Sequence, residues 1–371
     1  MLKNNDSKLK INFTGSRFVP DDTAKGLFLF LVFQTMVTLI YQVLYMVGLT
    51  QEIWSYVFTF ILQACFVLCV YFVAKPRNIN MVANLRLKRA PSIKQILLCV
   101  AISIVCLFGF SAITNIFLEV LYRMGYSSVT SEIVIPNFAS YLFYILVICI
   151  APAVCEEILF RGLICNGLKK MGNVVAVVGS AFIFMIMHGS PDQTVHQFIL
   201  GIILALAFLV TNNLWVSIVI HFVNNFIAIT ITYAFYGDSS STATESAELY
   251  LRDYLIYAIL SAIVAGVIIY VLLKLLSKAG KPIKEVEPVE RRSVNNSSVH
   301  EKDLDIDYAR DYGTAEEGKE EALTSVDVVT MVDNPYENKL SGSGKVMYVL
   351  SIVWLVVDWI SALALGFIQV V

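Results

Sequence analysis

Residues 141–162 read YLFYILVICIAPAVCEEILFRG, an apolar run that continues directly into Glu156, Glu157 and Arg161. A helix needs about 20 mostly apolar residues to cross the hydrocarbon layer of a membrane. The stretch is therefore typical of a membrane span that carries three ionisable side chains at its end. A charged side chain at membrane depth is costly unless it is paired or hydrated. These three residues thus indicate a functional site within a membrane helix.

The whole chain has the composition of a polytopic membrane protein. Its 371 residues are 57% hydrophobic and 15% charged, which is more apolar and less charged than a typical soluble domain. Candidate spans lie near residues 26–49, 53–74, 95–120, 138–160, 173–189, 196–211, 214–236, 254–276 and 346–369. The predicted fold is all-α, with about nine transmembrane helices and a core helical bundle that carries an intramembrane site.

Lysine and arginine predict the orientation of these spans, because cytoplasmic loops carry an excess of positive charge. Loop 75–94 contains several basic residues and no acidic one. Alternation then places the N-terminus, the turns expected at 161–172 and 212–213, and segment 277–345 on the same cytoplasmic side. The C-terminus is expected on the opposite side.

Composition also predicts the organisation of the chain. The expected parts are a cytoplasmic N-terminal segment (1–25), two N-terminal helices with the basic loop (26–94), a helical core (95–276), an acidic cytoplasmic segment (277–345) and a C-terminal helix (346–371). Segment 277–345 holds about half of the 29 acidic residues and few aromatic ones, so we expect it to be disordered.

Other sequence features exclude several classes of site. The seven cysteines are odd in number and lack CxxC spacing, which indicates neither a disulfide framework nor a zinc knuckle. There is no internal repeat and no nucleotide-binding glycine pattern, and the net charge of −2 does not indicate a nucleic-acid partner. The oligomeric state is left open.

Helical geometry separates the roles of the two glutamates. At 100° per residue, Glu157 and Arg161 share a face, whereas Glu156 is turned away by about a quarter circle. Glu157 and Arg161 are therefore expected to form an ion pair that holds the helix end. Glu156 is left to point into the bundle, where a carboxylate suits a general base or acid.

Two of the four histidines lie within later spans. Phe184 and His188 share a face in FIFMIMHG (182–189), and His221 and Asn225 share one in HFVNN (221–225). An imidazole and a carboxamide on one face offer hydrogen-bond donors to a developing oxyanion. Each motif alone is weak evidence, because a lone buried histidine is more often a satisfied core residue.

Two neighbouring polar residues are candidates of lower rank. Asn224 is expected to be a helix-packing amide, and His196 is expected at the membrane interface near the outer end of its helix. Counted from the cytoplasmic turns at about 1.5 Å per residue, Glu156, His188 and Asn225 reach similar depths of about 20 Å. The three motifs are therefore predicted to meet within the membrane.

Taken in order, EExxxR, FxxxH and HxxxN resemble the motifs of the CAAX-protease and bacteriocin-processing (CPBP or Abi) family of intramembrane endopeptidases, over about residues 95–236. The resemblance implies that Glu156 and His188 activate a water, that His221 and Asn225 stabilise the oxyanion, and that Glu157 and Arg161 support the site. It also implies a multi-pass protein of the bacterial plasma membrane. The implied partners are membrane lipid and a membrane-associated peptide or protein substrate.

The metal requirement and the activity itself have alternatives. Glu156, His188 and His221 could supply the three ligands of a catalytic zinc with an open fourth position, although HExxH is absent. We favour the metal-free, glutamate-dependent mechanism and name no certain cofactor. A non-catalytic scaffold or bacteriocin-immunity protein would keep the fold without needing Glu156 and His188 together. A transporter would be expected to show related halves with broken helices.

Overall fold

In the computed structural model, residues 17–48, 52–87, 90–128, 133–235, 251–280 and 339–368 are described. Within these ranges every regular element is a helix, so the predicted all-α class is confirmed. The α-helices are α1 (Pro20–Met46), α2 (Glu52–Ala74), α3 (Met81–Asn84), α4 (Ile93–Gly109), α5 (Ser111–Arg123), α6 (Phe138–Tyr144), α7 (Ala151–Glu157), α8 (Asn166–Leu168), α9 (Asn173–Met187), α10 (Thr194–Thr211), α11 (Leu214–Ala234), α12 (Leu251–Ala279) and α14 (Gly342–Ile368). The remaining elements are the π-helical segments η2 (Ile145–Ile150) and η3 (Ile158–Cys165) and the short 3₁₀ turns η1 (Lys75–Arg77), η4 (Lys169–Met171) and η5 (Pro191–Gln193).

The described part of the chain contains eight helical runs that are long and apolar enough to cross a membrane. The protein is thus of the multi-pass membrane class. The predicted span that is not among these eight is the fifth, 173–189, which corresponds to α9, a helix of only 15 residues. A helix of that length extends about 22 Å, which is shorter than the hydrocarbon core of about 30 Å. The predicted count is close, and the difference lies in a helix that ends inside the bundle.

The span expected at 138–160 is longer than its apolar run. The helix continues from Phe138 to Met171 through two π-helical segments. The prediction of a turn over residues 161–172 was therefore wrong. Hydropathy stopped the span at Arg161 because that residue is charged. In the fold Arg161 is fully buried and paired, so the charge needs no exit to water and the helix continues past it.

The N-terminal boundary also differs from the prediction. Helix α1 begins at Pro20 rather than near residue 26. Asp22 accepts a hydrogen bond from the Val19 amide at 3.0 Å and forms an ion pair with Arg77 of η1. The buried acid is thereby compensated, which allows the first turn to start within a charged stretch. Most of the acidic segment predicted to be disordered, residues 281–338, lies outside the described residues.

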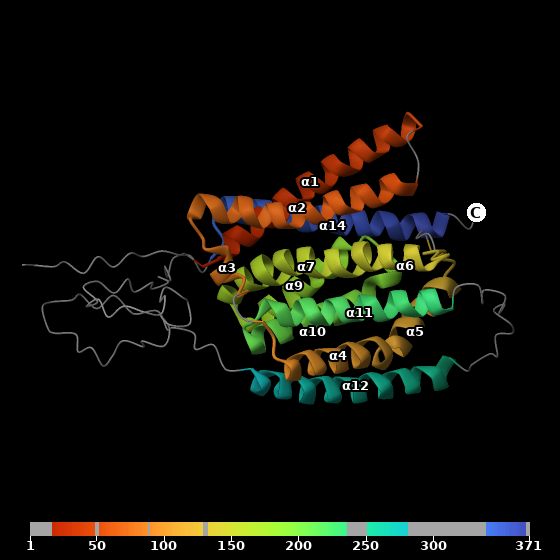
Figure 1. Cartoon of the computed structure of the whole chain (residues 1–371). Helices are drawn as coiled ribbons and strands as arrows, with labels where there is room; N and C mark the ends of the chain where they lie inside the picture. Colours follow the sequence, from red (N-terminus) through yellow and green to blue (C-terminus); the bar gives the residue numbers. More distant parts are fainter. Residues whose placement is uncertain are drawn as a thin grey trace, which may run out of the picture.

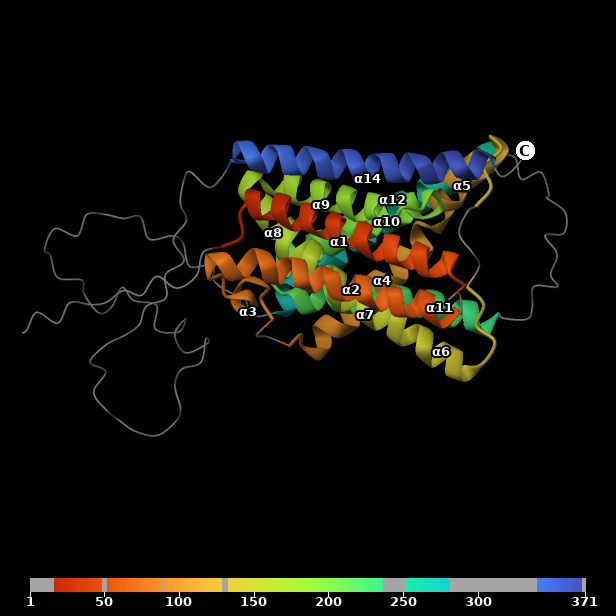
Figure 2. The ribbon, with the colours of Figure 1, turned by 90° about the horizontal axis from the view of Figure 1, so that it is seen from above.

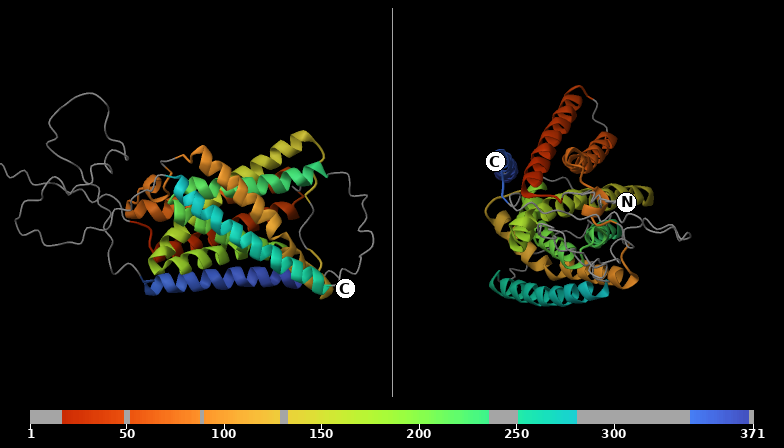
Figure 3. Two further views of the ribbon diagram at one scale, coloured as in Figure 1. Left: turned by 90° about the horizontal axis from the view of Figure 1, so that it is seen from below. Right: turned by 90° about the vertical axis from the view of Figure 1, so that its left-hand side faces the viewer.

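The helices surround the central run that contains α7. Helices α1, α2 and α14 lie on one side of it, and α4 and α12 lie on the other (Figure 1). Figure 2 shows α14 along one edge of the bundle, where it packs against α1 and α9. Seen from the end in Figure 3, α1 and α12 lie on opposite sides of the molecule. The residues of the three motifs therefore sit in the middle layer, with protein on both sides.

Close approach of α9 and α10 brings the middle layer together. A Cβ atom added to Gly201 of α10 would lie 3.0 Å from the Ala181 Cα atom of α9. Small residues allow membrane helices to pack at short distance, where lipid tails provide no hydrophobic driving force for association. Gly201 thus allows α10 to approach α9, and its carbonyl is used in the site described below.

One end of the bundle gathers the loops that alternation assigned to a single side. Arg77 of η1 pairs with Asp22 at the start of α1. The Asn166 side chain of α8 donates to the Asn84 carbonyl of α3 at 3.2 Å. The start of α1, the basic loop and the end of the central run therefore lie together, as the predicted topology requires.

The other end gathers the remaining loops. The Ser127 amide, which follows α5, donates to the Gly366 carbonyl near the end of α14 at 2.9 Å. The Tyr126 hydroxyl donates to Asp192 of η5 at 3.1 Å. Figure 1 shows α3 and the C-terminus at opposite ends of the bundle. The alternation of the spans is thus consistent with the fold, and the cytoplasmic position of the N-terminus stays a prediction.

Labelling of introduced cysteines tests this topology. Lys94, Met124 and Lys345 are exposed, whereas the seven native cysteines are buried or partly buried. We expect Lys94→Cys and Lys345→Cys to react with a membrane-impermeant thiol reagent from the cytoplasmic side only, and Met124→Cys from the opposite side only. The native chain provides the blank. Labelling of Lys94→Cys and Met124→Cys from the same side would contradict the arrangement, because one span separates them.

Candidate active site

The centre of the site is an ion pair from which water is excluded. Glu157 and Arg161 are both completely buried, and Arg161 Nη1 donates to Glu157 Oε1 at 2.7 Å. Arg161 Nη2 donates to the Gly201 carbonyl of α10 at 3.1 Å. The predicted pairing is confirmed, but its predicted place was wrong. The pair lies inside a continuous helix rather than at a helix end, where it joins the central run to α10.

His221 of α11 is the third member of this network. Its Nδ1 atom lies 2.9 Å from Glu157 Oε1. An ionised carboxylate can only accept, so Nδ1 carries a proton and donates it. The sequence paired His221 with Asn225 alone and missed this bond, because the partner lies on another helix. The bond sets the orientation of the ring and leaves Nε2 for a different partner.

The ring of Phe184 on α9 packs against both histidines and the arginine of the site. Its ring is completely buried and lies 4.7 Å from the His188 ring and 5.8 Å from the His221 ring, centroid to centroid. The Arg161 guanidinium lies 4.5 Å from the Phe184 centroid, a distance at which a cation is attracted to the face of a ring. Phe184 therefore brings both histidines and the arginine around one aromatic side chain.

His188 is the C-cap residue that directly follows α9. Its Nδ1 atom lies 2.7 Å from the Phe184 carbonyl. A carbonyl can only accept, so Nδ1 donates and Nε2 of the neutral ring is left with its lone pair. His188 also interacts electrostatically with Glu156 and His221. The structure thus brings the FxxxH and HxxxN histidines to the same site as the glutamates.

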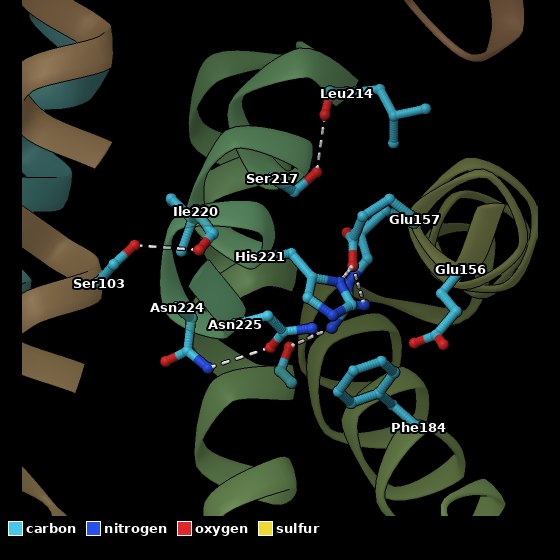
Figure 4. A network of polar contacts seen from close by, with 12 residues as sticks. Ser103, Glu156, Glu157, Phe184, Leu214, Ser217, Ile220, His221, Asn224 and Asn225 are labelled. Atoms are coloured by element: carbon cyan, nitrogen blue, oxygen red, sulfur yellow. Dashed lines mark hydrogen bonds and ion pairs between the residues drawn. The ribbon is translucent and has the colours of Figure 1, made fainter. Parts of the chain in front are cut away.

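Glu156 is held differently from its neighbour. Its Oε1 atom accepts a hydrogen bond at 3.0 Å from the Nε2 atom of Gln63 on α2. Its Oε2 atom is buried and has no hydrogen-bond partner among the described residues. Figure 4 shows the Glu157 carboxylate against the His221 ring, whereas the Glu156 carboxylate lies apart from that ring. The predicted division of faces is therefore confirmed.

Sequence reasoning did not identify Gln63. The residue is 7% exposed and lies in the middle of the apolar span predicted at 53–74. A polar side chain within such a span is a recognised indication of function. That signal was present in the sequence, but nothing in it indicated that the partner of Gln63 would be Glu156.

Asn225 lies one turn from His221 on α11. Its Nδ2 atom donates at 2.9 Å to the Ile148 carbonyl, which belongs to the π-helical segment η2. Wider π-helical turns often occur at functional sites. One of the two amide hydrogens of Asn225 is thus used for positioning, and the second remains for another acceptor. Figure 4 shows Asn225 and His221 projecting from α11 in the same direction.

Asn224 and His196 form the border of the site. Asn224 Nδ2 lies 3.3 Å from His196 Nε2 and 3.4 Å from Asn225 Oδ1. The expected packing role of Asn224 agrees with these contacts. His196 is partly buried and interacts electrostatically with His188 and His221. It therefore faces the histidine cluster from α10 rather than standing apart from it at the interface.

The predicted zinc ligands Glu156, His188 and His221 all lie in this site. Among the described residues, no group of three histidine, cysteine, aspartate or glutamate side chains is placed to hold a metal ion. The Nδ1 atoms of both histidines face protein acceptors, which leaves Nε2 of each ring available, as in histidines that bind a metal through one ring nitrogen and donate from the other. The zinc set stays a prediction, and we derive no chemical step through a metal.

Comparison with known families identifies the central segment. Residues 138–227 match the family model of type II CAAX prenyl endopeptidases, Rce1-like. The segment is similar to this family, and we call residues 138–227 the Rce1-like domain. It contains every residue of the three predicted motifs, from Glu156 to Asn225, whereas Gln63 and α14 lie outside it. No curated protein and no solved structure matches the chain.

The match agrees with the family resemblance predicted from the motifs. At the level of the family, the Rce1-like domain supports a CAAX-type endopeptidase that acts in a membrane. The matched segment covers the central run, α9, α10 and part of α11. These are the elements that carry the buried charges and both site histidines.

The buried network yields a prediction about stability. Arg161→Ala would leave Glu157 buried without its cation, so we expect a loss of about 3–5 kcal/mol in the free energy of unfolding. Glu157→Gln combined with Arg161→Met removes both charges and should be milder. Unfolding in mixed detergent micelles would measure both.

The chain contains a matched control for this experiment. Arg123 and Glu119 form the same i, i+4 pair at 2.7 Å, but with side chains that are 59% and 47% exposed. Arg123→Ala should therefore cost about 0–1 kcal/mol. Equal losses for Arg161→Ala and for the double variant would contradict a charge-compensating role of the arginine.

Proposed function

We propose that this protein is an intramembrane endopeptidase that hydrolyses peptide bonds of membrane-associated proteins or peptides. The observation that carries the proposal is the unequal use of two adjacent glutamates. Glu157 Oε1 accepts from the charged guanidinium of Arg161 and from His221, whereas Glu156 Oε1 accepts from the neutral amide of Gln63. The Oε2 atom of each glutamate is buried without a hydrogen-bond partner among the described residues, so the two differ in the charge of the group that holds Oε1. A scaffold would need the first carboxylate to hold its helices, but it would have no use for the second.

Glu156 and His188 are suited to activate a water molecule. Glu156 is 8% exposed and accepts a hydrogen bond from the neutral amide of Gln63. Its Oε2 atom has no hydrogen-bond partner among the described residues and is placed to accept a proton. His188 presents the lone pair of Nε2 because Nδ1 donates to the Phe184 carbonyl. A water between them could lose a proton as its oxygen attacks the peptide carbonyl.

His221 and Asn225 are suited to stabilise the oxyanion of the tetrahedral intermediate. His221 can donate from Nε2 only when its ring carries a second proton, since Nδ1 already donates to Glu157. The Glu157 carboxylate orients the ring through Nδ1, as the carboxylate of a catalytic triad does. Asn225 adds the amide hydrogen that the Ile148 carbonyl does not use. Two donors from one helix face would then meet the developing charge.

The charges of the proposed site balance. Glu157 and Arg161 cancel each other, and the Glu156 carboxylate offsets an imidazolium at His221. Such compensation is needed because an unpaired charge buried in a protein within lipid carries a large desolvation cost. When the intermediate collapses, the proton held by Glu156 or His188 passes to the nitrogen of the leaving amine. The peptide bond is replaced by a carboxylic acid and an amine, and the site returns to its starting state.

The membrane depth of the site favours a substrate that is itself held at the membrane. Glu156 and the two histidines lie on apolar helices of the central layer. The family match adds the C-terminal CAAX peptide as a first substrate to try, in prenylated and unprenylated forms. Zinc stays an untested prediction, which metal analysis of the purified protein would address.

Replacement of Glu156 tests the proposal directly. Glu156→Gln keeps the size of the side chain and its contact with α2, but an amide cannot accept the proton. We expect turnover of a reconstituted substrate to fall by about two to four orders of magnitude. Peptides released from membranes by the native chain and by the variant would identify substrates without a prior choice.

The same substitution at the surface provides the control. The Glu119 side chain is 47% exposed and pairs with Arg123, away from the site, so Glu119→Gln should leave turnover unchanged. Near-native proteolysis by a folded Glu156→Gln protein would remove the proposed mechanism. Absence of any proteolysis by the native chain would leave the scaffold function as the better explanation.

Asn225→Ala tests the proposed oxyanion donor. Removal of one such donor typically lowers kcat by about 10²–10³-fold, and we expect a loss of that size with little change in KM. Asn115→Ala, at an exposed amide of α5, is the control. A rise in KM at constant kcat would instead place Asn225 among residues that bind the ground state of the substrate.

A further inference from the structure

We propose that Gln63 of α2 is a positioning residue that orients the Glu156 carboxylate for proton abstraction. The inference rests on the proposed function, in which Glu156 is the base. It extends the site beyond the Rce1-like domain, since α2 lies outside residues 138–227. The functional unit would therefore include an N-terminal helix that the family match does not cover.

The hydrogen bond between the two side chains is the starting observation. Gln63 Nε2 donates to Glu156 Oε1 at 3.0 Å, and both side chains are buried. The bond uses one carboxylate oxygen and leaves Oε2 without a hydrogen-bond partner in the described part of the chain. A single donor thus selects which oxygen of Glu156 is held and which remains for chemistry.

The chemical character of the donor matters as much as its position. Glu157 is held by a guanidinium, which compensates its charge as well as fixing its geometry. A carboxamide donates a hydrogen bond but brings no positive charge, and it has no proton that it can lose. Gln63 can therefore restrict the rotation of the Glu156 side chain while leaving it a base. Two adjacent glutamates receive two kinds of partner.

The surroundings of Gln63 fix α2 against the central run on both sides of the contact. The Tyr56 hydroxyl lies 2.5 Å from the Tyr144 hydroxyl of α6. In the other direction, the Phe66 ring lies 6.1 Å from the Phe160 ring of η3. Tyr56, Gln63 and Phe66 are spaced to share one face of the helix. The amide is therefore presented from a rigid element, as accurate positioning of a reacting group requires.

Substitution of Gln63 tests the inference on the full-length protein reconstituted in lipid vesicles. Gln63→Met keeps the length of the side chain and removes the donor. We expect kcat for the substrate identified by comparison with Glu156→Gln to fall by about 10–100-fold, because a base displaced by about 1 Å can lose that much. KM should remain unchanged, since Gln63 is not assigned to substrate binding. Gln34→Met makes the same chemical change on α1 and should alter neither constant.

Exchanging the hydrogen-bond donor and acceptor between Gln63 and Glu156 separates an effect on catalysis from an effect on stability. Gln63→Glu is isosteric and places two acceptors together, which should lower the thermal stability and kcat. Adding Glu156→Gln restores a hydrogen bond with donor and acceptor reversed, so stability should recover while proteolysis stays absent. If Gln63→Met does not fold, Gln63→Glu carries the kinetic test.

The outcomes are distinguishable. Native kcat in folded Gln63→Met, or a change confined to KM, would overturn the positioning role while leaving Glu156 as the base. Absence of Glu156-dependent proteolysis in the native protein would overturn the proposed function and this role with it. Failure of the exchanged pair to recover stability would show that the two side chains do not interact as the structure has them.

Discussion

The arrangement of the central helices depends on one buried carboxylate. Glu157 Oε1 receives Arg161 Nη1 at 2.7 Å and His221 Nδ1 at 2.9 Å, and Arg161 extends the network to the Gly201 carbonyl. Three separate helical elements are joined through this oxygen. Because a buried charge without partners is strongly unfavourable, the relative depth and rotation of these elements must satisfy Glu157 first. The positions of His188, Phe184 and Glu156 follow from that condition.

The network also explains how two identical neighbours take different roles. A step of one residue turns the side chain by about 100°, so Glu156 faces α2 while Glu157 faces α11. One finds a neutral amide and the other finds a cation. Phe184 fills the space between them with a ring that contacts both histidines and the guanidinium. Of the two consecutive glutamates, Glu157 is thus the one whose charge is compensated, and Glu156 is the one left for the proposed chemistry.

Backbone hydrogen bonding imposes a second constraint, because lipid cannot satisfy free amides and carbonyls. The π-helical segment η2 offers the Ile148 carbonyl to Asn225. Helix α9 ends early, and the loop after it is covered by protein: Asp358 of α14 lies against Gly189, and the Trp359 indole donates to Thr194. Irregular backbone near the site is thus possible where other helices enclose it, and α14 contributes part of that enclosure.

The sequence by itself determined the all-α membrane class, the approximate spans, the pairing of Glu157 with Arg161 and the set of motif residues that the Rce1-like match contains. These follow from hydropathy and from the helical repeat, which are local properties of the chain. The tertiary structure decided the continuation of helix through Arg161, the bond from His221 to Glu157, the use of Asn225 at Ile148 and the contact of Gln63 with Glu156. The hydropathy pattern ended the predicted span at Arg161, whose burial is compensated in the fold by Glu157 and by the Gly201 carbonyl of α10. The same pattern gave no indication that α2 contributes to the site. Partners on different helices depend on the depth and rotation that packing gives each helix, and no local pattern in one segment specifies them.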